Sequence, residues 1–177
     1  MRICILGATG LVGREAIGLV ARAWPGAELR LYASRDQTLE LDGERYEVLG
    51  APKLEDKAAP KGDLALVALD DDHSKRYVPR LLALGYRVID KSSVYRADPR
   101  VPLVTAGVNS DRLDDSVRLV ANPNCTTIPL VCEDFPLQSV LKSFGHPPLN
   151  EIDAKDHWPA LAESAGWAHG LGRIDRL

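Results

Sequence analysis

The sequence has few cysteines, and their spacing excludes two kinds of structure. Cys4, Cys125 and Cys132 are an odd number in 177 residues, and no two of them form a C-x-x-C pair. Such a set argues against a disulfide framework and against a zinc site. We therefore expect no metal, and we expect the protein to work in a reducing compartment, the cytoplasm.

Long apolar runs and a strong excess of one charge are also missing. No apolar stretch approaches the roughly 18 residues that span a membrane. The opening MRICILGATG is too short and too interrupted by glycine for a signal peptide. The net charge of −3 gives no reason to expect a nucleic-acid partner or an anionic membrane surface. With 45% hydrophobic and 27% charged residues, the chain is suited to one well-packed globular domain.

Strand-like and helix-like segments alternate along the first 121 residues. Runs typical of strands occupy residues 2–6, 28–34, 63–69, 86–90 and 117–121, helical spacing occupies 11–23 and 73–85, and a hairpin pattern around Asp42-Gly43 occupies 39–49. This order predicts an α/β fold, a Rossmann-like doubly wound, mostly parallel sheet with helices on both faces. We expect residues 1–145 to form this domain. Residues 146–177 are expected to form an irregular or partly helical tail, with helical spacing only at 159–168.

A glycine-rich stretch, GATGLVG, joins the first strand to the first helix at residues 7–13. In this context Gly7 permits a tight turn, Gly10 lets backbone N–H groups approach a pyrophosphate, and Gly13 allows close packing of helix on strand. The helix N-terminus adds partial positive charge. The alternative is a glycine turn without a ligand, which the strand–helix context disfavours. The expected dinucleotide-binding residues are Gly7, Thr9, Gly10, Leu11, Val12 and Gly13.

The end of the second strand bears on which dinucleotide is bound. There the sequence reads YASRDQ, so Ser34 and Arg35 precede Asp36. A carboxylate at this point is typical of an NAD site, whereas a hydroxyl and an arginine suit the 2′-phosphate of NADP. Arg35 could instead be an ordinary solvated loop arginine. Together with the glycine stretch, the pattern favours NADP.

Five stretches in fixed order resemble the N-terminal half of aspartate-semialdehyde dehydrogenase: ILGATGLVG, ASRD, VIDKSSVYRADPRVPLV, GVN and NPNCTTIPL. The NPNC stretch is the most discriminating, because the related acetylglutamyl-phosphate reductases resemble NPGC there. The resemblance covers residues 1 to about 145. It implies NADP-dependent reductive dephosphorylation of aspartyl phosphate through a cysteine thioester, in the biosynthesis of lysine, threonine and methionine.

The resemblance also implies roles for individual residues. Cys125 would be the nucleophile, with Asn124 orienting substrate or backbone beside its thiol. Arg96 would bind phosphate, and Ser92 and Ser93 would line the cofactor side. Local physics supports the first role, since a cysteine at a helix N-terminus has its thiolate stabilised by backbone N–H groups. The alternative for Cys125, a buried and inert thiol, is what we expect for Cys4 and Cys132.

The chain also departs from the family. After the strand at residues 63–69 it carries Asp70, Asp71 and Asp72, which would repel cofactor phosphates unless they face solvent or cap the next helix, as Asp72 could. Lys91 stands where the family usually has asparagine. Motifs of the family's second domain, which supplies a glutamine, a substrate-binding arginine and the general-base histidine, are not found. No base is assigned among the remaining candidates, His146, His157 and His169.

Two classes of function therefore stay open. The first is an enzyme acting on aspartate semialdehyde and phosphate, as a homo-oligomer or with a separately encoded catalytic half; an acetylglutamyl-phosphate reductase is a related alternative. The second is a dinucleotide-binding module without turnover, left by a deletion or a frameshift near residue 146.

Overall fold

The computed structural model describes residues 1–128, which contain a seven-stranded sheet. The strand order is β3-β4-β2-β1-β5-β6-β7. In chain order the elements are β1 Arg2–Leu6, α1 Leu11–Ala23, β2 Glu28–Ala33, β3 Gln37–Leu41, β4 Glu44–Gly50, the 3-10 turn η1 Ala51–Glu55, β5 Leu64–Val67, α2 Asp71–Ala83, β6 Arg87–Asp90, the 3-10 turn η2 Ser110–Arg112 and β7 Leu119–Ala121.

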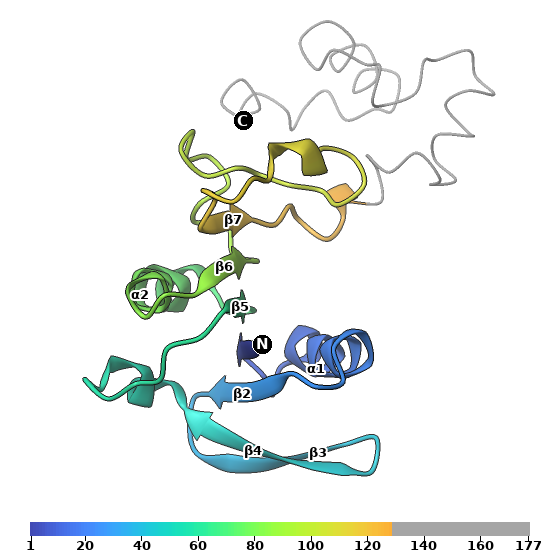
Figure 1. Ribbon diagram of the computed structural model, residues 1–177, viewed down its shortest axis with the longest axis vertical. Coiled ribbons are helices and arrows are strands. Elements are labelled where there is room, and N and C mark those ends of the chain that lie inside the picture. The colour runs from blue at the N-terminus through green and yellow to red at the C-terminus, as the bar shows by residue number, and fades with distance from the viewer. Residues whose placement is uncertain (129–177) are drawn as a thin grey trace, which may run out of the picture. The chain divides into compact units, whose positions relative to one another are not determined.

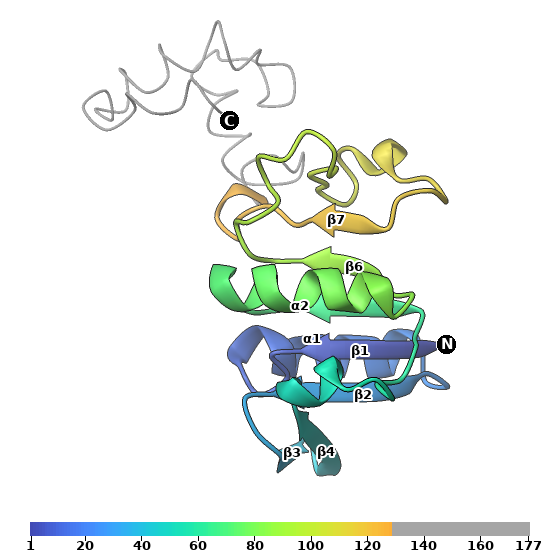
Figure 2. The same cartoon turned by 90° about the vertical axis from the view of Figure 1, so that its left-hand side faces the viewer.

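The sheet is mostly parallel, and helices α1 and α2 lie on its opposite faces. β1 pairs in parallel with β2 on one side and with β5 on the other, and β6 and β7 continue the parallel order. Figure 1 shows the sheet edge-on with α1 on one face and α2 on the other, and Figure 2 shows α2 in front of the sheet, running along the direction of the strands. The predicted doubly wound α/β fold is confirmed.

The predicted hairpin is also confirmed, as β3 and β4. The two strands pair antiparallel, with Leu41 opposite Glu44. Asp42 and Gly43 both have positive φ, 53° and 81°, which is the backbone of a two-residue type I′ turn. β4 then pairs in parallel with β2, so the hairpin extends the sheet beyond β2.

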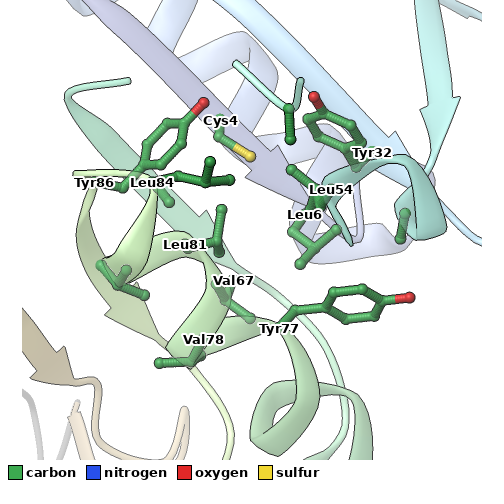
Figure 3. Packing of buried hydrophobic residues seen from close by; sticks show 14 residues of the cluster. Cys4, Leu6, Tyr32, Leu54, Val67, Tyr77, Val78, Leu81, Leu84 and Tyr86 are labelled. Carbon is green, nitrogen blue, oxygen red and sulfur yellow. The ribbon is translucent and has the colours of Figure 1, made fainter. Parts of the chain in front are cut away.

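β1 is buried on both faces, which explains why its sequence is continuously apolar. Cys4 and Leu6 point into the cluster under α2, together with Tyr86 (Figure 3). Ile3 and Ile5 point into the cluster under α1. The core therefore consists of two layers, one on each side of the central strand.

Helix α2 begins and ends two residues earlier than the predicted 73–85. Its N-cap is Asp70, whose carboxylate accepts a hydrogen bond from the His73 N–H at 3.0 Å. Pro79 lies inside the helix without ending it. After Leu84 the chain passes through Gly85 at φ +91°, a left-handed conformation that closes the helix.

The chain divides into two compact units. Residues 1–105 and 109–123 form the first, and residues 106–108 and those from 124 onward belong to the second. In the part that the structure describes, no helix is long and apolar enough to cross a membrane. The expectations that lie outside the described residues are the boundary at 145, the tail 146–177, the helix 159–168, Cys132, His146, His157 and His169.

Candidate functional site: the carboxyl edge of the sheet and Cys125

Most predicted site residues follow the carboxyl ends of parallel strands. The glycine stretch follows β1, Ser34 and Arg35 follow β2, and the segment 91–96 follows β6. Because α1 and α2 cover opposite faces, the winding reverses between β1 and β5, and open α/β sheets bind ligands in the crevice at such a point. The fold thus brings these segments to one edge of the sheet.

Two glycines of the stretch are required by the fold itself. Gly7 has φ +89°, and a Cβ added there would lie 2.3 Å from the Ala68 carbonyl oxygen. A Cβ on Gly13 would lie 2.1 Å from the Gly7 carbonyl oxygen. The tight turn and the close packing predicted for these two positions are therefore confirmed.

Gly10 differs, because the protein alone does not require a glycine there. It is the N-cap of α1 with φ −73°, and an added Cβ would meet only the Gly7 oxygen, at 3.4 Å. Within residues 1–128 no side chain caps this helix, and no acidic residue lies in its first turn. Leu11 and Val12 beside it are 81% and 45% exposed. This arrangement fits a dinucleotide phosphate, since the helix N-terminus is accessible and uncapped.

A cation beside this loop was missed by the sequence reasoning. Arg14 donates from Nε to the Thr9 carbonyl oxygen at 3.1 Å, which places its exposed guanidinium next to the glycine stretch. Its spacing, four residues after Gly10 on the first helix, is the signal that could have identified it.

At the end of β2, the arginine and the carboxylate have different surroundings. Arg35 is exposed and has no hydrogen bond or ion pair to the described residues. Asp36 accepts from the Gly50 N–H at 2.6 Å and from Lys53 Nζ at 2.7 Å. The hydrogen bond from Lys53 makes the largest contribution to lowering the pKa of Asp36, and the bond from the Gly50 N–H lowers it further. Lys53 is 17 residues away in sequence, so no local pattern could have revealed it.

Ser92 faces the interior, where it holds the turn after β6. The Asp90 carboxylate is fully buried and accepts from Ser74 Oγ at 2.9 Å and from Ser92 Oγ. Ser92 Oγ in turn accepts from the Val94 N–H at 3.3 Å. We infer that any contribution of Ser92 to a bound cofactor acts through the turn that it holds in place.

Ser93 is bound by a carboxylate of the chain. Its N–H and hydroxyl donate to Asp71 at 2.9 and 2.5 Å, and these bonds lower the pKa of Asp71. The expectation that Asp72 caps α2 is wrong, because the helix begins two residues earlier than predicted and places Asp70 at the cap. Asp72 is exposed and lies 3.8 Å from Lys75 Nζ.

Arg96 joins the carboxyl ends of β6 and β7. Its Nε donates to the Asn122 carbonyl at 3.0 Å and its Nη2 to the Lys91 carbonyl at 2.8 Å. Within the described residues Nη1 has no acceptor, so this group is available to an anion. The two backbone contacts hold the guanidinium at this edge of the sheet.

Cys125 lies in the second unit, at the start of a helical turn. It is exposed, and its thiol donates to Asn124 Oδ1 at 3.6 Å. The same amide oxygen accepts from the Thr126 N–H and hydroxyl at 2.9 and 2.8 Å. The Asn124 carbonyl accepts from the Thr127 and Ile128 N–H groups at 2.9 and 3.1 Å. Asn124 therefore orders the backbone around the thiol.

Cys4 is fully buried in β1, and burial raises the pKa of its thiol to about 12. The described residues contain no group of three or more histidine, cysteine or acidic side chains placed to hold a metal ion. The thiol suited to chemistry in this part of the chain is that of Cys125.

A cavity of about 520 Å³ is lined by residues of β2, of β4 and of the segment 53–60. Arg30, Arg45 and Lys53 contribute to its lining. Each of these cations is paired with a carboxylate of the chain. The cavity therefore offers no unpaired cation to a ligand, and we assign it none.

The two glycine positions predict different mutant behaviour. Gly13→Ala should destabilise the protein by at least about 1–3 kcal/mol, because the new methyl group overlaps a backbone carbonyl. Gly10→Ala should unfold at nearly the wild-type temperature but bind dinucleotide at least about tenfold more weakly, since its methyl group occupies the approach to the helix N-terminus. Thermal unfolding and a fluorescence titration measure the two effects. Wild-type affinity in Gly10→Ala would contradict the assignment of the loop.

The two described thiols should differ in reactivity. Limiting iodoacetamide at pH 7 should alkylate Cys125 in the folded protein and leave Cys4 unmodified, because a buried thiol with a pKa of about 12 carries almost no thiolate. Peptide mapping by mass spectrometry measures both sites, and Cys4 should react only after denaturant is added. Alkylation of Cys4 before Cys125 would show that β1 is not the central strand.

Comparison with known proteins is consistent with this architecture. Residues 2–116 match the family model described as the semialdehyde dehydrogenase, NAD binding domain. The chain is 39% identical over 145 residues to the aspartate-semialdehyde dehydrogenase of Synechocystis sp., covering 79% of this chain and 42% of the relative. It is 39% identical over 137 residues to that of Aquifex aeolicus, covering 73% and 39% of the two chains.

A solved structure gives the same result. Aspartate semialdehyde dehydrogenase II of Vibrio cholerae, complexed with ASA, superposes with a TM-score of 0.63 at 29% identity, covering 78% of this chain and 46% of the other. The chain spans about two fifths of the length of the curated relatives it matches. The family resemblance seen in the sequence is confirmed, and this chain belongs to the semialdehyde dehydrogenase family, whose NAD-binding domain it carries in residues 2–116.

Proposed function

We propose that this chain is the cofactor-binding and nucleophile-bearing part of an NADP-dependent aspartate-semialdehyde dehydrogenase. The observation that carries the proposal is the exposed Cys125 at the start of a helical turn, within the NPNC motif. The matched relatives are aspartate-semialdehyde dehydrogenases, which supports aspartate semialdehyde and phosphate as the substrates. Because the nucleophile must stay reduced, a reducing compartment such as the cytoplasm suits this chemistry.

In this proposal the Cys125 thiolate attacks the carbonyl carbon of the acyl phosphate. A carbon–sulfur bond forms, phosphate leaves with the electrons of the carbon–oxygen bond, and a thioester remains on the protein. NADPH, when bound, supplies the hydride that reduces this thioester. The Cys125 sulfur then leaves as thiolate and the aldehyde is released. A thiolate suits both steps because it is a good nucleophile and a good leaving group.

Asn124 is proposed to position this sulfur. Its side-chain oxygen accepts two hydrogen bonds from Thr126 and, while the sulfur is protonated, one from the Cys125 thiol. The Asn124 backbone carbonyl starts the helical turn, which directs N–H groups toward its N-terminus.

The glycine stretch and the end of β2 are proposed to bind the cofactor. The uncapped N-terminus of α1 takes the pyrophosphate, with Arg14 beside it. Ser34 and Arg35 take the 2′-phosphate of NADP. Arg96 is proposed to bind the substrate phosphate through Nη1, beside Ser93.

The described residues contain one histidine, His73, and its ring nitrogen is 2.8 Å from the Asp70 carboxylate. It is therefore tied to the cap of α2 and is not proposed as the base. The proposal places the acid–base group on a further segment, in a homo-oligomer or on a separately encoded catalytic half.

Cofactor preference tests the proposal that this chain binds NADP. The chain should bind NADPH more tightly than NADH, and Arg35→Ala should remove most of the difference. Loss of charge-assisted bonds costs about 1.5–3 kcal/mol, which is roughly a ten- to hundredfold change in affinity. Arg22→Ala, at the other end of α1, should leave the preference unchanged. Equal affinities for the two cofactors in the wild-type protein would contradict the assignment to NADP.

Turnover tests the proposal that Cys125 is the nucleophile and that the acid–base group lies on a further segment. When NADP, phosphate and aspartate semialdehyde are added to this 177-residue chain, the aldehyde should form an adduct with Cys125. The absorbance at the reduced-nicotinamide band should increase little in the steady state. Acid–base assistance is worth about 10²–10⁴ in rate, and substrate positioning contributes several more powers of ten. Cys125→Ser is the control, in which the aldehyde adduct should disappear.

An ordinary enzymatic rate, on the order of 1–10³ s⁻¹, would show that the chain contains its own acid–base group. Dinucleotide binding without any Cys125 adduct would instead favour a binding module without turnover. The adduct is measured by intact mass under native conditions, as one added aldehyde per chain that Cys125→Ser lacks.

A further inference from the structure

The end of β2 carries two opposing signals for cofactor choice. Arg35 suits a 2′-phosphate, whereas a carboxylate such as Asp36 is the group that accepts the 2′-hydroxyl of NAD. The two residues are adjacent, so the local sequence does not decide between them. Their surroundings in the folded chain differ, and this difference bears on which of them can reach a ribose.

Asp36 is directed toward the corner between β4 and η1. One carboxylate oxygen accepts the Gly50 N–H at 2.6 Å and the other accepts Lys53 Nζ at 2.7 Å. A Cβ on Gly50 would lie 3.3 Å from the Asp36 oxygen, so the absence of a side chain there permits the approach. Both oxygens of Asp36 are thus engaged by one short segment of the chain.

Arg35 has the opposite environment. It is exposed and has no hydrogen bond or ion pair to the described residues, although a carboxylate follows it directly. Without Lys53, the Asp36 oxygen that it holds would be available to Arg35 or to a ribose hydroxyl, while the Gly50 N–H would still hold the other oxygen. Lys53 therefore affects two groups that matter for recognition of the 2′ position.

We propose that Lys53 is a specificity-determining residue, which withdraws Asp36 from the ribose and leaves Arg35 to bind the 2′-phosphate. The inference rests on the proposed function for its cofactor. Lys53 acts through Asp36 in this arrangement, so it is a positioning residue and not itself a ligand of the phosphate. An exposed ion pair of this kind contributes little to stability, so its effect should appear in binding.

The experiment compares dissociation constants for NADPH and NADH, measured by fluorescence titration of the full chain. In Lys53→Met the preference for NADPH should fall at least about tenfold, through weaker NADPH binding and tighter NADH binding. Asp36→Asn should keep the wild-type preference. The double variant Asp36→Asn, Lys53→Met should again prefer NADPH as the wild-type protein does, because it has no Asp36 carboxylate that loss of Lys53 could free. Lys57→Met, an exposed lysine in the same segment, is the matched control.

Each outcome decides the inference. If Lys53→Met weakened the binding of NADPH and NADH equally, the ion pair would have a structural role and the inference would be overturned. A double variant that stays unselective would show that Lys53 contacts the phosphate directly, which also overturns it. A wild-type protein that prefers NADPH while Lys53→Met keeps that preference refutes only this inference. A wild-type protein that binds neither cofactor refutes the proposed function together with it.

Discussion

The carboxyl edge of the sheet depends on the close approach of main chains where β1 ends, against the start of α1 and against the end of β5. A Cβ at Gly13 would lie 2.1 Å from the Gly7 oxygen, and one at Gly7 would lie 2.3 Å from the oxygen of Ala68. With no side chains between them, the first turn of α1 lies directly over the point where the winding of the sheet reverses. The uncapped helix N-terminus and the ends of the neighbouring strands then share one edge.

Carboxylates are numerous at this edge, and donors of the chain hold most of them. Asp36 is held by Lys53, Asp70 by the first turn of α2, Asp71 by Ser93, and Asp90 by two buried hydroxyls. A carboxylate that is already hydrogen-bonded has its charge spread over fixed donors and its direction set. An acidic edge is in this way compatible with a phosphate-bearing cofactor, and it orders the loops that carry the proposed site.

Elements that depend on residues close together in the sequence could be predicted from it. The bounds of β1 and α1 agree with expectation, because an apolar run, a glycine turn and helical spacing are each settled within a few residues. The hairpin at Asp42-Gly43 follows from the positive φ that a type I′ turn requires. The start of α2 was missed because three consecutive aspartates can each act as a cap, and the local sequence does not show which of them does.

The sequence by itself determined the α/β order of elements, the glycine stretch and the identity of the exposed Cys125 as the candidate nucleophile. Only the tertiary structure decided which donor meets which acceptor. Lys53 reaches Asp36 across 17 residues, and Arg96 reaches the Asn122 carbonyl across 26. Periodicity and turn chemistry act between neighbours along the chain. Such pairings instead arise from strand register and from loops that return to the same edge, which no local pattern encodes.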